Sequence, residues 1–413
     1  MKFKLEDLCE FQKGYAFKSK DFVEDGEYIV KVTNLTSDSV EFMNCVKISY
    51  DKAQEYEKYK LNNKDIIITT VGSWPNNPNS IVGKVVRVPN IKKKAFLNQN
   101  AVRVRGININ QEFLYYLLRD KKFSDYLIAT AQGSASQASI TQKDIKDYIV
   151  DIPNNNEQKA IAKILSDLDE KIEVNNKINK NLEEMAQAIF KQWFVDFEFP
   201  NEEGKPYKSS GGEMVKSELG MIPKGWKIFK LGDFIKFIKG KKPKKIEEKF
   251  FDGCELYLTI DVLNRNSEIF ANKDKIIEVN DDDILMVMDG ASSGSLYYGL
   301  NGILGSTLAK ISVLNTIDKS FLYYYLKLNE SSIKSHLTGS AIPHTDKEFI
   351  NKLCLAIPND EMILKKADTI LNNIRNHTIN LNTECSKIKK VRDTLLPKLM
   401  SGEIRVPLEN SEN

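Results

Sequence analysis

The sequence predicts an α+β protein in which two similar mixed α/β domains are separated by two long helices that pair with each other. Two observations predict this fold. Apolar residues recur in alternating steps of four and three from Ile161 to Trp193, and the same pattern recurs from Ala367 to Leu399. The segment before each pattern reads as the same succession of short strands and one helix. The chain therefore contains a duplicated unit, a domain followed by a long helix.

Each apolar seam is typical of a helix that packs lengthwise on another helix, and at 1.5 Å per residue each helix would be roughly 55 Å long. The pairing positions of the first seam are Ile161, Leu165, Leu168, Ile172, Leu182 and Ile189. Those of the second seam are Leu371, Ile374, Leu381, Ile388 and Leu395. Two independent surface helices are the alternative, but a surface helix usually has a wider and less regular apolar stripe.

Polar residues interrupt the first seam at Asn175 and Asn179. In an antiparallel pair we expect them to face Thr378 of the second seam. Such polar positions lower stability but fix the register of the two helices.

Gly, Pro and Asn residues between the periodic segments indicate where the domains, helices and strands begin and end. A first domain covers 1–152, a long helix 153–198, a linker 199–221, a second domain 222–357, a second long helix 358–405 and a tail 406–413. The linker is rich in Pro, Gly and Ser and has no apolar period. In the first domain we expect strands at 28–32, 66–71, 81–88, 101–104 and 148–152, one helix at 111–131 and a polar loop at 133–137.

The second domain repeats short segments of the first in the same order. Residues 230–233 echo 4–7, residues 321–326 echo 113–118, and residues 339–341 echo 133–135. The corresponding loops at 72–79 and 290–299 share little. Similar frames with dissimilar loops suggest two modules that do one job on two targets.

Composition sets the broad class. The 413 residues are 41% hydrophobic and 28% charged with a net charge of +3, so affinity for nucleic acid would have to come from local clusters of cations. The five cysteines are scattered, which indicates a reducing compartment. No apolar run approaches the length of about 18 residues that a membrane span needs, and the N-terminus carries acids where a signal peptide would be apolar. We expect a cytoplasmic protein that does not contact the membrane.

No catalytic or metal-binding constellation is recognisable. Gly83-Lys84 is followed by Val85, so no phosphate loop is present. The three histidines are too far apart for a His-based metal motif, and Glu247-Glu248-Lys249 is more typical of a solvated face than of a nuclease. We therefore expect no catalytic residue, metal or cofactor in this chain.

Clusters of basic and polar residues are the best candidates for a binding surface. Clustered lysines can neutralise phosphates, and Arg, Asn or Gln on loops can read base edges, although solubility alone explains any one cluster equally well. The DNA-binding candidates in the first domain are Lys92, Lys93, Lys94, Arg103, Arg105, Ser136 and Gln137. Those in the second domain are Lys239, Lys241, Lys242, Lys244, Lys245 and His344.

Three local motifs extend this pattern: Trp193-Phe194-Val195-Asp196-Phe197, Gly220-Met221-Ile222-Pro223-Lys224-Gly225-Trp226, and the run Leu395 to Ile404. With the duplicated architecture, the chain resembles the specificity subunit of type I restriction-modification systems over nearly its whole length. The resemblance implies two target-recognition domains, 1–152 and 222–357, each reading one half of a split double-stranded DNA site. It also implies that the two long helices form an antiparallel coiled coil that holds these domains apart. Arg392 on the second seam departs from the repeat and puts the symmetry of the two helices in question.

The resemblance also implies partners. The helices would dock two methyltransferase subunits that bring S-adenosylmethionine, while restriction subunits would supply ATP-dependent translocase and Mg-dependent nuclease activities. The alternatives are a non-catalytic coiled-coil scaffold or a subunit of a related combined restriction-methylation enzyme. A scaffold would not need two domains with divergent loops, and the combined enzyme would need Asn-Pro-Pro followed by an aromatic residue, where this chain has only Asn77-Pro78-Asn79. We therefore favour a non-catalytic DNA-recognition subunit.

Overall fold

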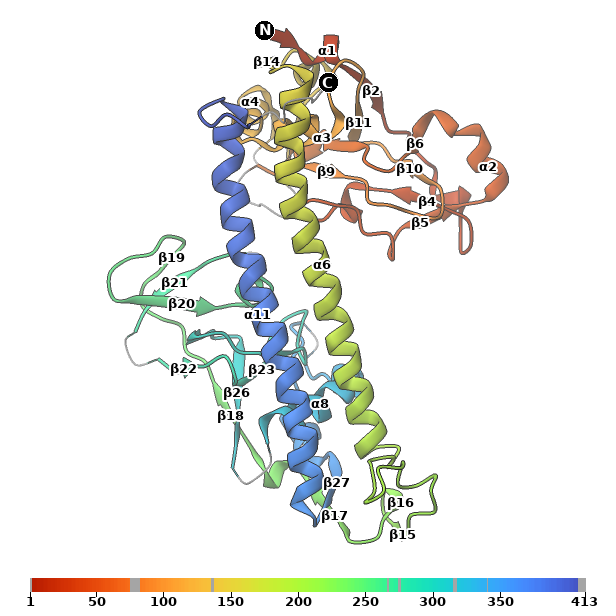
Figure 1. The fold of residues 1–413 in the computed structure, drawn as a ribbon, viewed down its shortest axis with the longest axis vertical. Helices are drawn as coiled ribbons and strands as arrows, with labels where there is room; N and C mark the ends of the chain where they lie inside the picture. Colours follow the sequence, from red (N-terminus) through yellow and green to blue (C-terminus); the bar gives the residue numbers. More distant parts are fainter. Residues whose placement is uncertain are drawn as a thin grey trace. The chain divides into compact units, whose positions relative to one another are not determined.

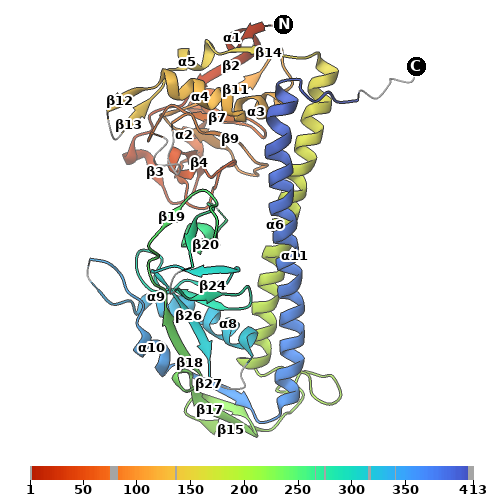
Figure 2. The same cartoon turned by 90° about the vertical axis from the view of Figure 1, so that its left-hand side faces the viewer.

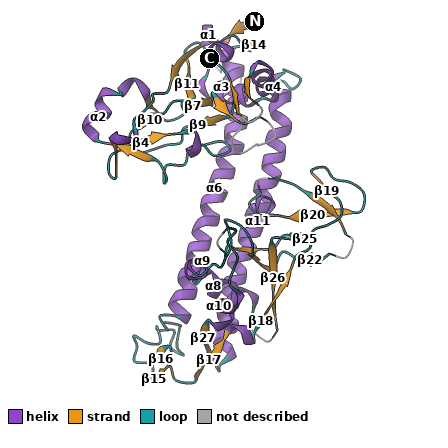
Figure 3. Cartoon of the chain, turned by 180° about the vertical axis from the view of Figure 1, so that it is seen from behind, coloured by secondary structure: helices purple, strands orange, loops and turns teal. Residues whose placement is uncertain are grey.

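The computed structural model describes residues 2–74, 82–134, 137–265, 267–273, 276–314, 318–339 and 341–407. The chain divides into two compact units, Met1–Asn175 with Glu384–Asn413, and Asn176–Thr383. Each unit joins one mixed α/β domain to a part of both long helices, so the predicted α+β class is confirmed (Figure 3). The units cut both helices, whereas the predicted domain boundaries keep each helix whole; those boundaries stay predictions.

The two predicted long helices are α6 (Asn155–Phe194) and α11 (Glu361–Met400), each of 40 residues, and they run side by side (Figure 1). Each begins after a side chain that accepts a backbone N–H of the first turn. Asn154 Oδ1 accepts from Glu157 at 3.0 Å, and Asp360 Oδ1 accepts from Met362 at 2.8 Å. Gly402, with φ 73°, follows the end of α11, where the left-handed conformation favours glycine.

The helices are antiparallel, because the numbers of paired residues rise along α6 as they fall along α11. In the first unit Asn175 Nδ2 donates to Glu384 at 2.8 Å, and in the second Asn179 Nδ2 donates to Asn382 Oδ1 at 2.9 Å. The expectation that both asparagines face Thr378 is therefore wrong. The register places Thr378 beyond the partner of Asn179.

The pairing positions differ in burial. Ile161, Leu165 and Leu395 join the core of the first domain, and Leu371 and Ile374 join the core of the second. The remaining positions either are buried, as are Ile172 and Leu381, or are half-buried, as are Leu168, Leu182, Ile189 and Ile388. One helix surface thus serves both its partner helix and a globular domain.

The first domain is built on two sheets (Figure 2). An antiparallel sheet has the order β2 (Cys9–Lys13), β11 (Ala101–Gly106), β7 (Ile66–Thr69), β9 (Val85–Arg87). A mixed sheet has the order β3 (Phe22–Val23), β5 (Val46–Ile48), β4 (Glu27–Val30), β10 (Ala95–Leu97), β6 (Lys60–Leu61), and its β4 and β10 are parallel. Two smaller sheets pair β1 (Lys2–Lys4) with β14 (Ile149–Asp151), and order β12 (Gln132–Ser134), β13 (Gln137–Ser139), β8 (Val71–Gly72). The helices are α1 (Leu5–Leu8), α2 (Tyr50–Glu55), α3 (Gln111–Arg119), α4 (Lys121–Thr130) and α5 (Gln142–Lys146).

Two predictions for this domain need correction. The single helix expected at 111–131 is broken into α3 and α4, because Asp120 adopts an extended backbone and its side chain accepts the N–H of Lys122 at 2.7 Å as a helix cap. The polar loop expected at 133–137 is flanked by paired strands, β12 and β13. Residues 75–79 of the first divergent loop, Ile81 and Ser136 lie outside the described residues.

The second domain repeats the two main sheets and the β1–β14 pair, while isolated bridges take the place of the three-stranded sheet. Its antiparallel sheet has the order β18 (Ile235–Lys239), β26 (Leu308–Val313), β23 (Ile284–Val287), β24 (Leu296–Tyr298). Its mixed sheet has the order β19 (Ile246–Glu247), β21 (Phe270–Asn272), β20 (Cys254–Leu258), β25 (Gly302–Leu304), β22 (Glu278–Val279), with β20 and β25 parallel. Strand β17 (Trp226–Lys230) pairs with β27 (Cys354–Pro358). The helices are α7 (Ile260–Leu263), α8 (Lys319–Leu328), α9 (Glu330–Ser335) and α10 (Lys347–Lys352).

A glycine directly follows β2 in the first domain and β18 in the second. The N–H of Gly14 donates to Ala101 O and that of Gly240 to Leu308 O, both at 3.0 Å. A Cβ atom at Gly14 would lie 1.9 Å from Asn98 O, and one at Gly240 would lie 2.0 Å from Gly305 O. Only glycine fits there, so the backbone leaves the sheet in the same way in both domains.

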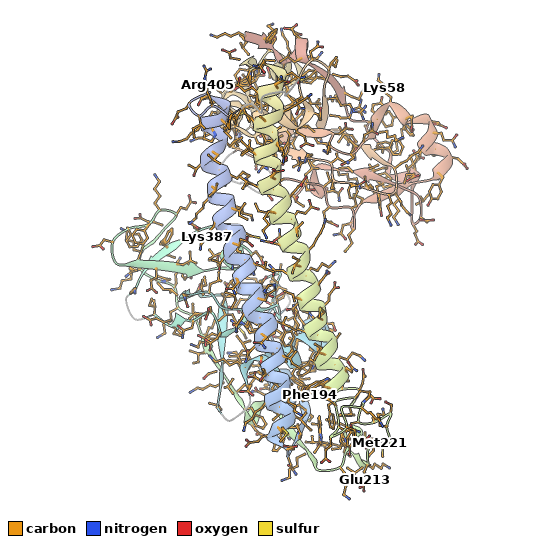
Figure 4. The ribbon with its side chains drawn as sticks, in the orientation of Figure 1. Lys58, Phe194, Glu213, Met221, Lys387 and Arg405 are labelled. Atoms are coloured by element: carbon orange, nitrogen blue, oxygen red, sulfur yellow. The ribbon has the colours of Figure 1, made fainter. Side chains whose placement is uncertain are left out.

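The predicted linker carries structure of its own. Strands β15 (Met214–Ser217) and β16 (Gly220–Pro223) form a hairpin, on which Figure 4 labels Met221. Phe199 stacks on Tyr207 and Trp226, with ring centroids 4.6 and 5.3 Å away. The three rings hold this segment against the second domain.

Candidate nucleic-acid interface

The loop that leaves β18 concentrates exposed cations in the second domain. Lys241, Lys242 and Lys244 are exposed, and within the described ranges no acid forms an ion pair with them. Lys245 differs, because its Nζ lies 3.1 Å from Glu247 and 4.0 Å from the ring centroid of Phe251. Three of the five predicted lysines of this region are therefore available for phosphate oxygens.

Lys239 and His344 meet at Asp289 and form what we call the polar cluster. Lys239 Nζ lies 2.9 Å from Asp289 Oδ2, and His344 Nδ1 lies 2.7 Å from Asp289 Oδ1. Burial alone would raise the pKa of Asp289, but the hydrogen bonds from Lys239 and His344 hold that pKa below its ordinary value. The carboxylate thus stays charged and holds two donors in place. Sequence reasoning missed Asp289, which nothing in its local sequence distinguishes.

In the first domain the lysine run before β10 is partly neutralised. Lys93 Nζ lies 3.3 Å from Asp25 and Lys94 Nζ lies 3.5 Å from Glu57. Lys92 is exposed and makes no ion pair with the part of the chain that the structure describes. All three stay predicted DNA contacts, and Lys92 is the most available of them because Lys93 and Lys94 form ion pairs within the domain.

Arg103 is buried and Arg105 is half-buried, and both bind acids of the first domain; they stay predicted DNA contacts, but much of their bonding capacity is used within the domain. Arg103 is only 5% exposed, and its guanidinium donates to Lys60 O at 2.6 Å and to Glu10 at 2.8 Å. Arg105 binds both oxygens of buried Asp65, at 2.6 and 2.7 Å. Two residues apart on β11, the arginines face the same side of the sheet, which the sequence pattern did not connect with Asp65.

Of the two candidates in the polar hairpin, Gln137 is exposed in β13, and Ser136 lies outside the described residues. Both stay predictions. Sequence reasoning also missed Lys18 and Lys20, which are exposed on the loop after Gly14. The repeated Lys-Gly pair at 13–14 and 239–240 could have revealed Lys18, because aligning it places Lys18 opposite Lys244; Lys20 falls opposite Ile246.

The chain thus contains two copies of one domain whose matched loops carry different side chains. A comparison with known protein families explains this arrangement. Residues 1–184 and 223–390 match the family described as type I restriction modification DNA specificity domain. The chain belongs to this family. The matched segments contain both globular domains and most of both long helices.

Individual relatives agree. The specificity subunit of the type I restriction enzyme MjaIX from Methanocaldococcus jannaschii is 30% identical over 314 residues, which cover 71% of this chain and 69% of that protein. The MjaVIII specificity subunit of the same organism is 34% identical over 183 residues, which cover 44% of this chain but only 43% of that protein. The crystal structure of a type I restriction-modification S subunit from M. genitalium has the same fold, with a TM-score of 0.55, 19% identity and coverage of 97% of this chain and 95% of that one.

The chain is thus a non-catalytic DNA specificity subunit with two target-recognition domains. Among the described residues, no three His, Cys, Asp or Glu side chains gather as metal ligands. The described helices likewise include none long and apolar enough to cross a membrane.

Proposed function

We propose that this specificity subunit binds a bipartite site in double-stranded DNA, with one half read by each target-recognition domain. The exposed lysines 241, 242 and 244 carry the DNA-binding part of the proposal. Unpaired cations on a loop release condensed counterions when they meet phosphates, which gives affinity that is independent of sequence. Two copies of one frame with different loops support the reading of two different half-sites.

We also propose that the long helices dock two methyltransferase subunits. Large apolar side chains stand exposed on both helices: Ile164, Val174, Met185, Met362 and Val391 are between 36% and 59% exposed. A partner that packs along the helices would remove these side chains from water. S-adenosylmethionine would then be bound by the methyltransferase subunits, and ATP and Mg by restriction subunits that join the same cytoplasmic complex.

The test of DNA binding removes three charges from the loop. We expect K241A/K242A/K244A to weaken binding to every duplex and to reduce the slope of log affinity against log salt by up to about 0.9 per lost contact. Fluorescence anisotropy at several salt concentrations measures both quantities.

A matched control is K208A/K216A/K227A, which removes the same charge from exposed lysines in or beside the β15–β16 hairpin. We expect it to leave the slope unchanged. An equal loss in both variants would assign the effect to net charge, and no loss in either would overturn the assignment of the loop to DNA.

A further inference from the structure

The two target-recognition domains place different side chains on one matched pair of backbone positions. In the first domain Val71 pairs with Ser139, and in the second Asp289 pairs with His344 in the same antiparallel sense. The next hydrogen bond also matches, since Ile140 N–H donates to Thr70 O and Thr345 N–H donates to Met288 O, both at 2.9 Å. The backbone is therefore copied, and only the side chains have diverged.

Resting on the proposed DNA binding, we infer that this pair of positions determines the base sequence each domain selects, and that the polar cluster reads a C·G pair. In the major groove guanine offers two acceptors, N7 and O6, while cytosine offers the N4 amino donor. Lys239 supplies a donor for guanine, and the Asp289 carboxylate supplies an acceptor for cytosine. The side chains of Lys239, Asp289 and His344 are 52%, 26% and 50% exposed, so all three can be reached by a base edge.

The support beneath the cluster is rigid, as a reading site requires. Ser293 is 1% exposed, and its hydroxyl lies 2.8 Å from Gly290 O and 2.9 Å from Pro343 O. The N–H of Gly290 donates to Pro343 O at 3.0 Å. These hydrogen bonds join the loop that follows Asp289 to the segment that precedes His344, so the backbone positions of both residues are fixed relative to each other.

The cluster also lies beside the proposed phosphate contacts. Lys239 ends β18, and the exposed lysines 241, 242 and 244 follow within five residues. Lysines that contact backbone phosphates would fix the position of the domain along the DNA, and the donor and acceptor of the polar cluster beside them would then meet a base edge.

In the first domain Lys13 matches Lys239, but the positions that match Asp289 and His344 have a different chemistry. Val71 is half-buried and apolar, and Ser139 is exposed with a hydroxyl that suits any base. An apolar side chain favours the thymine methyl group. We therefore expect an A·T pair at the step of the first half-site that corresponds to the C·G pair of the second.

The test transplants the first pair into the second domain, as D289V/H344S in the full chain with its methyltransferase subunits. Selection from duplexes with both half-sites randomised, read as methylated sequences, should lose the preference for C·G at one step of one half-site by about ten- to hundredfold. The other half-site should be unchanged. K241A/K242A/K244A serves as the control, because it should weaken all sequences and alter no preference.

The outcomes separate the two proposals. A folded transplant that selects the native sequence at every step overturns the inference while leaving DNA binding intact. If the native complex selects no duplex at all, the proposed function fails instead. Should circular dichroism show that the transplant is unfolded, D289A carries the test, because it removes the proposed acceptor for cytosine from a side chain that is 26% exposed. A folded D289A complex that keeps the native preference also overturns the inference.

Discussion

The two units fasten their domains to the long helices by different chemistry. In the first unit Arg392 of α11 lies 2.6 Å from Asp169 of α6, and Tyr116 of α3 donates to the same carboxylate at 2.7 Å. In the second unit Arg375 of α11 lies 3.7 Å above the ring centroid of Tyr298 and forms no ion pair with the described residues. Both arginines are 8% exposed. Each unit thus buries one arginine of α11 against its domain. An ion pair accommodates Arg392 in the first unit, and the face of an aromatic ring accommodates Arg375 in the second.

The difference explains a departure from the sequence repeat. Arg392 occupies an apolar position of the seam, and Asp169, four residues after Leu165, supplies its countercharge. Burial alone would lower the pKa of Arg392, but the hydrogen bond and the charge of Asp169 raise it above its ordinary value. A buried pair of this kind is sensitive to the loss of one partner, because the other charge is then left without compensation.

The largest effect is expected for Arg392→Ala. Removing one partner of a buried, hydrogen-bonded ion pair should lower the free energy of unfolding by about 3–5 kcal/mol. Urea denaturation followed by circular dichroism measures the loss. The double variant D169L/R392M removes both charges and should recover most of the stability. If the double variant is no more stable than Arg392→Ala, packing rather than charge would account for the loss.

Periodicity and repetition allowed the long helices, their pairing and the duplicated frame to be predicted, because the spacing of apolar residues specifies these features. The antiparallel direction was implied only by the family resemblance. The partners of individual polar residues could not be predicted. Arg103 and Arg105 looked like free cations, but the sheet brings Glu10 beside Arg103 and Asp65 beside Arg105. Asp289 was overlooked, since its partners Lys239 and His344 come from distant segments. Long-range pairing of side chains depends on strand register, which local patterns do not specify.

A second comparison concerns the buried acid before the central strand of each domain. Asp65 accepts the N–H of Asn62 at 2.7 Å and pairs with Arg105, whereas Asp283 accepts the N–H of Asn280 at 2.9 Å and pairs with Lys310 and Lys319. Burial raises the pKa of Asp283, but these hydrogen bonds and charges lower it below its ordinary value overall.

Asp283→Asn should therefore lower the free energy of unfolding at pH 7 by about 1.5–3 kcal/mol, the range for a hydrogen bond to a charged group. A depressed pKa contributes stability that is present above the unfolded value, about 3.9, and is lost as pH falls through the folded value. The gap between the native protein and the variant should thus narrow as the pH falls below about 4. Urea titrations at pH 7 and at acid pH measure the gap, and a gap that stays constant would contradict the ionic role.

Arg375→Met tests the aromatic anchor and should have a smaller effect than the change at Arg392. A desolvated cation–π contact contributes about 0.5–2 kcal/mol, and the buried Nε of Arg375 lacks a hydrogen-bond partner in the described structure, which reduces what is lost. Met keeps much of the apolar stem in place. A loss as large as that of Arg392→Ala would mean that Arg375 is stabilised by a countercharge rather than by the Tyr298 ring.

The smallest effect is expected at the polar pair of the helix seam in the second unit. Asn179 Nδ2 donates to Asn382 Oδ1 at 2.9 Å, but Asn179 Oδ1 is buried and has no hydrogen-bond partner among the described residues. Replacing both partners of such a bond by apolar side chains is close to neutral or stabilising. We therefore expect N179L/N382L to change the free energy of unfolding by no more than about 1 kcal/mol, most of it in the stabilising direction.

The N179L/N382L variant should lose the unique register of the two helices. A polar pair on an apolar seam disfavours other registers, because they would separate its two members. Hydrogen exchange of the backbone amides around Asn179 would measure that loss as faster opening at unchanged global stability. Asn175 provides the contrast in the first unit, since Asn175→Leu removes a donor from Glu384, which keeps Lys171 at 3.4 Å. If N179L/N382L destabilised the protein by well over 1 kcal/mol, the pair would be a source of stability and not a register device.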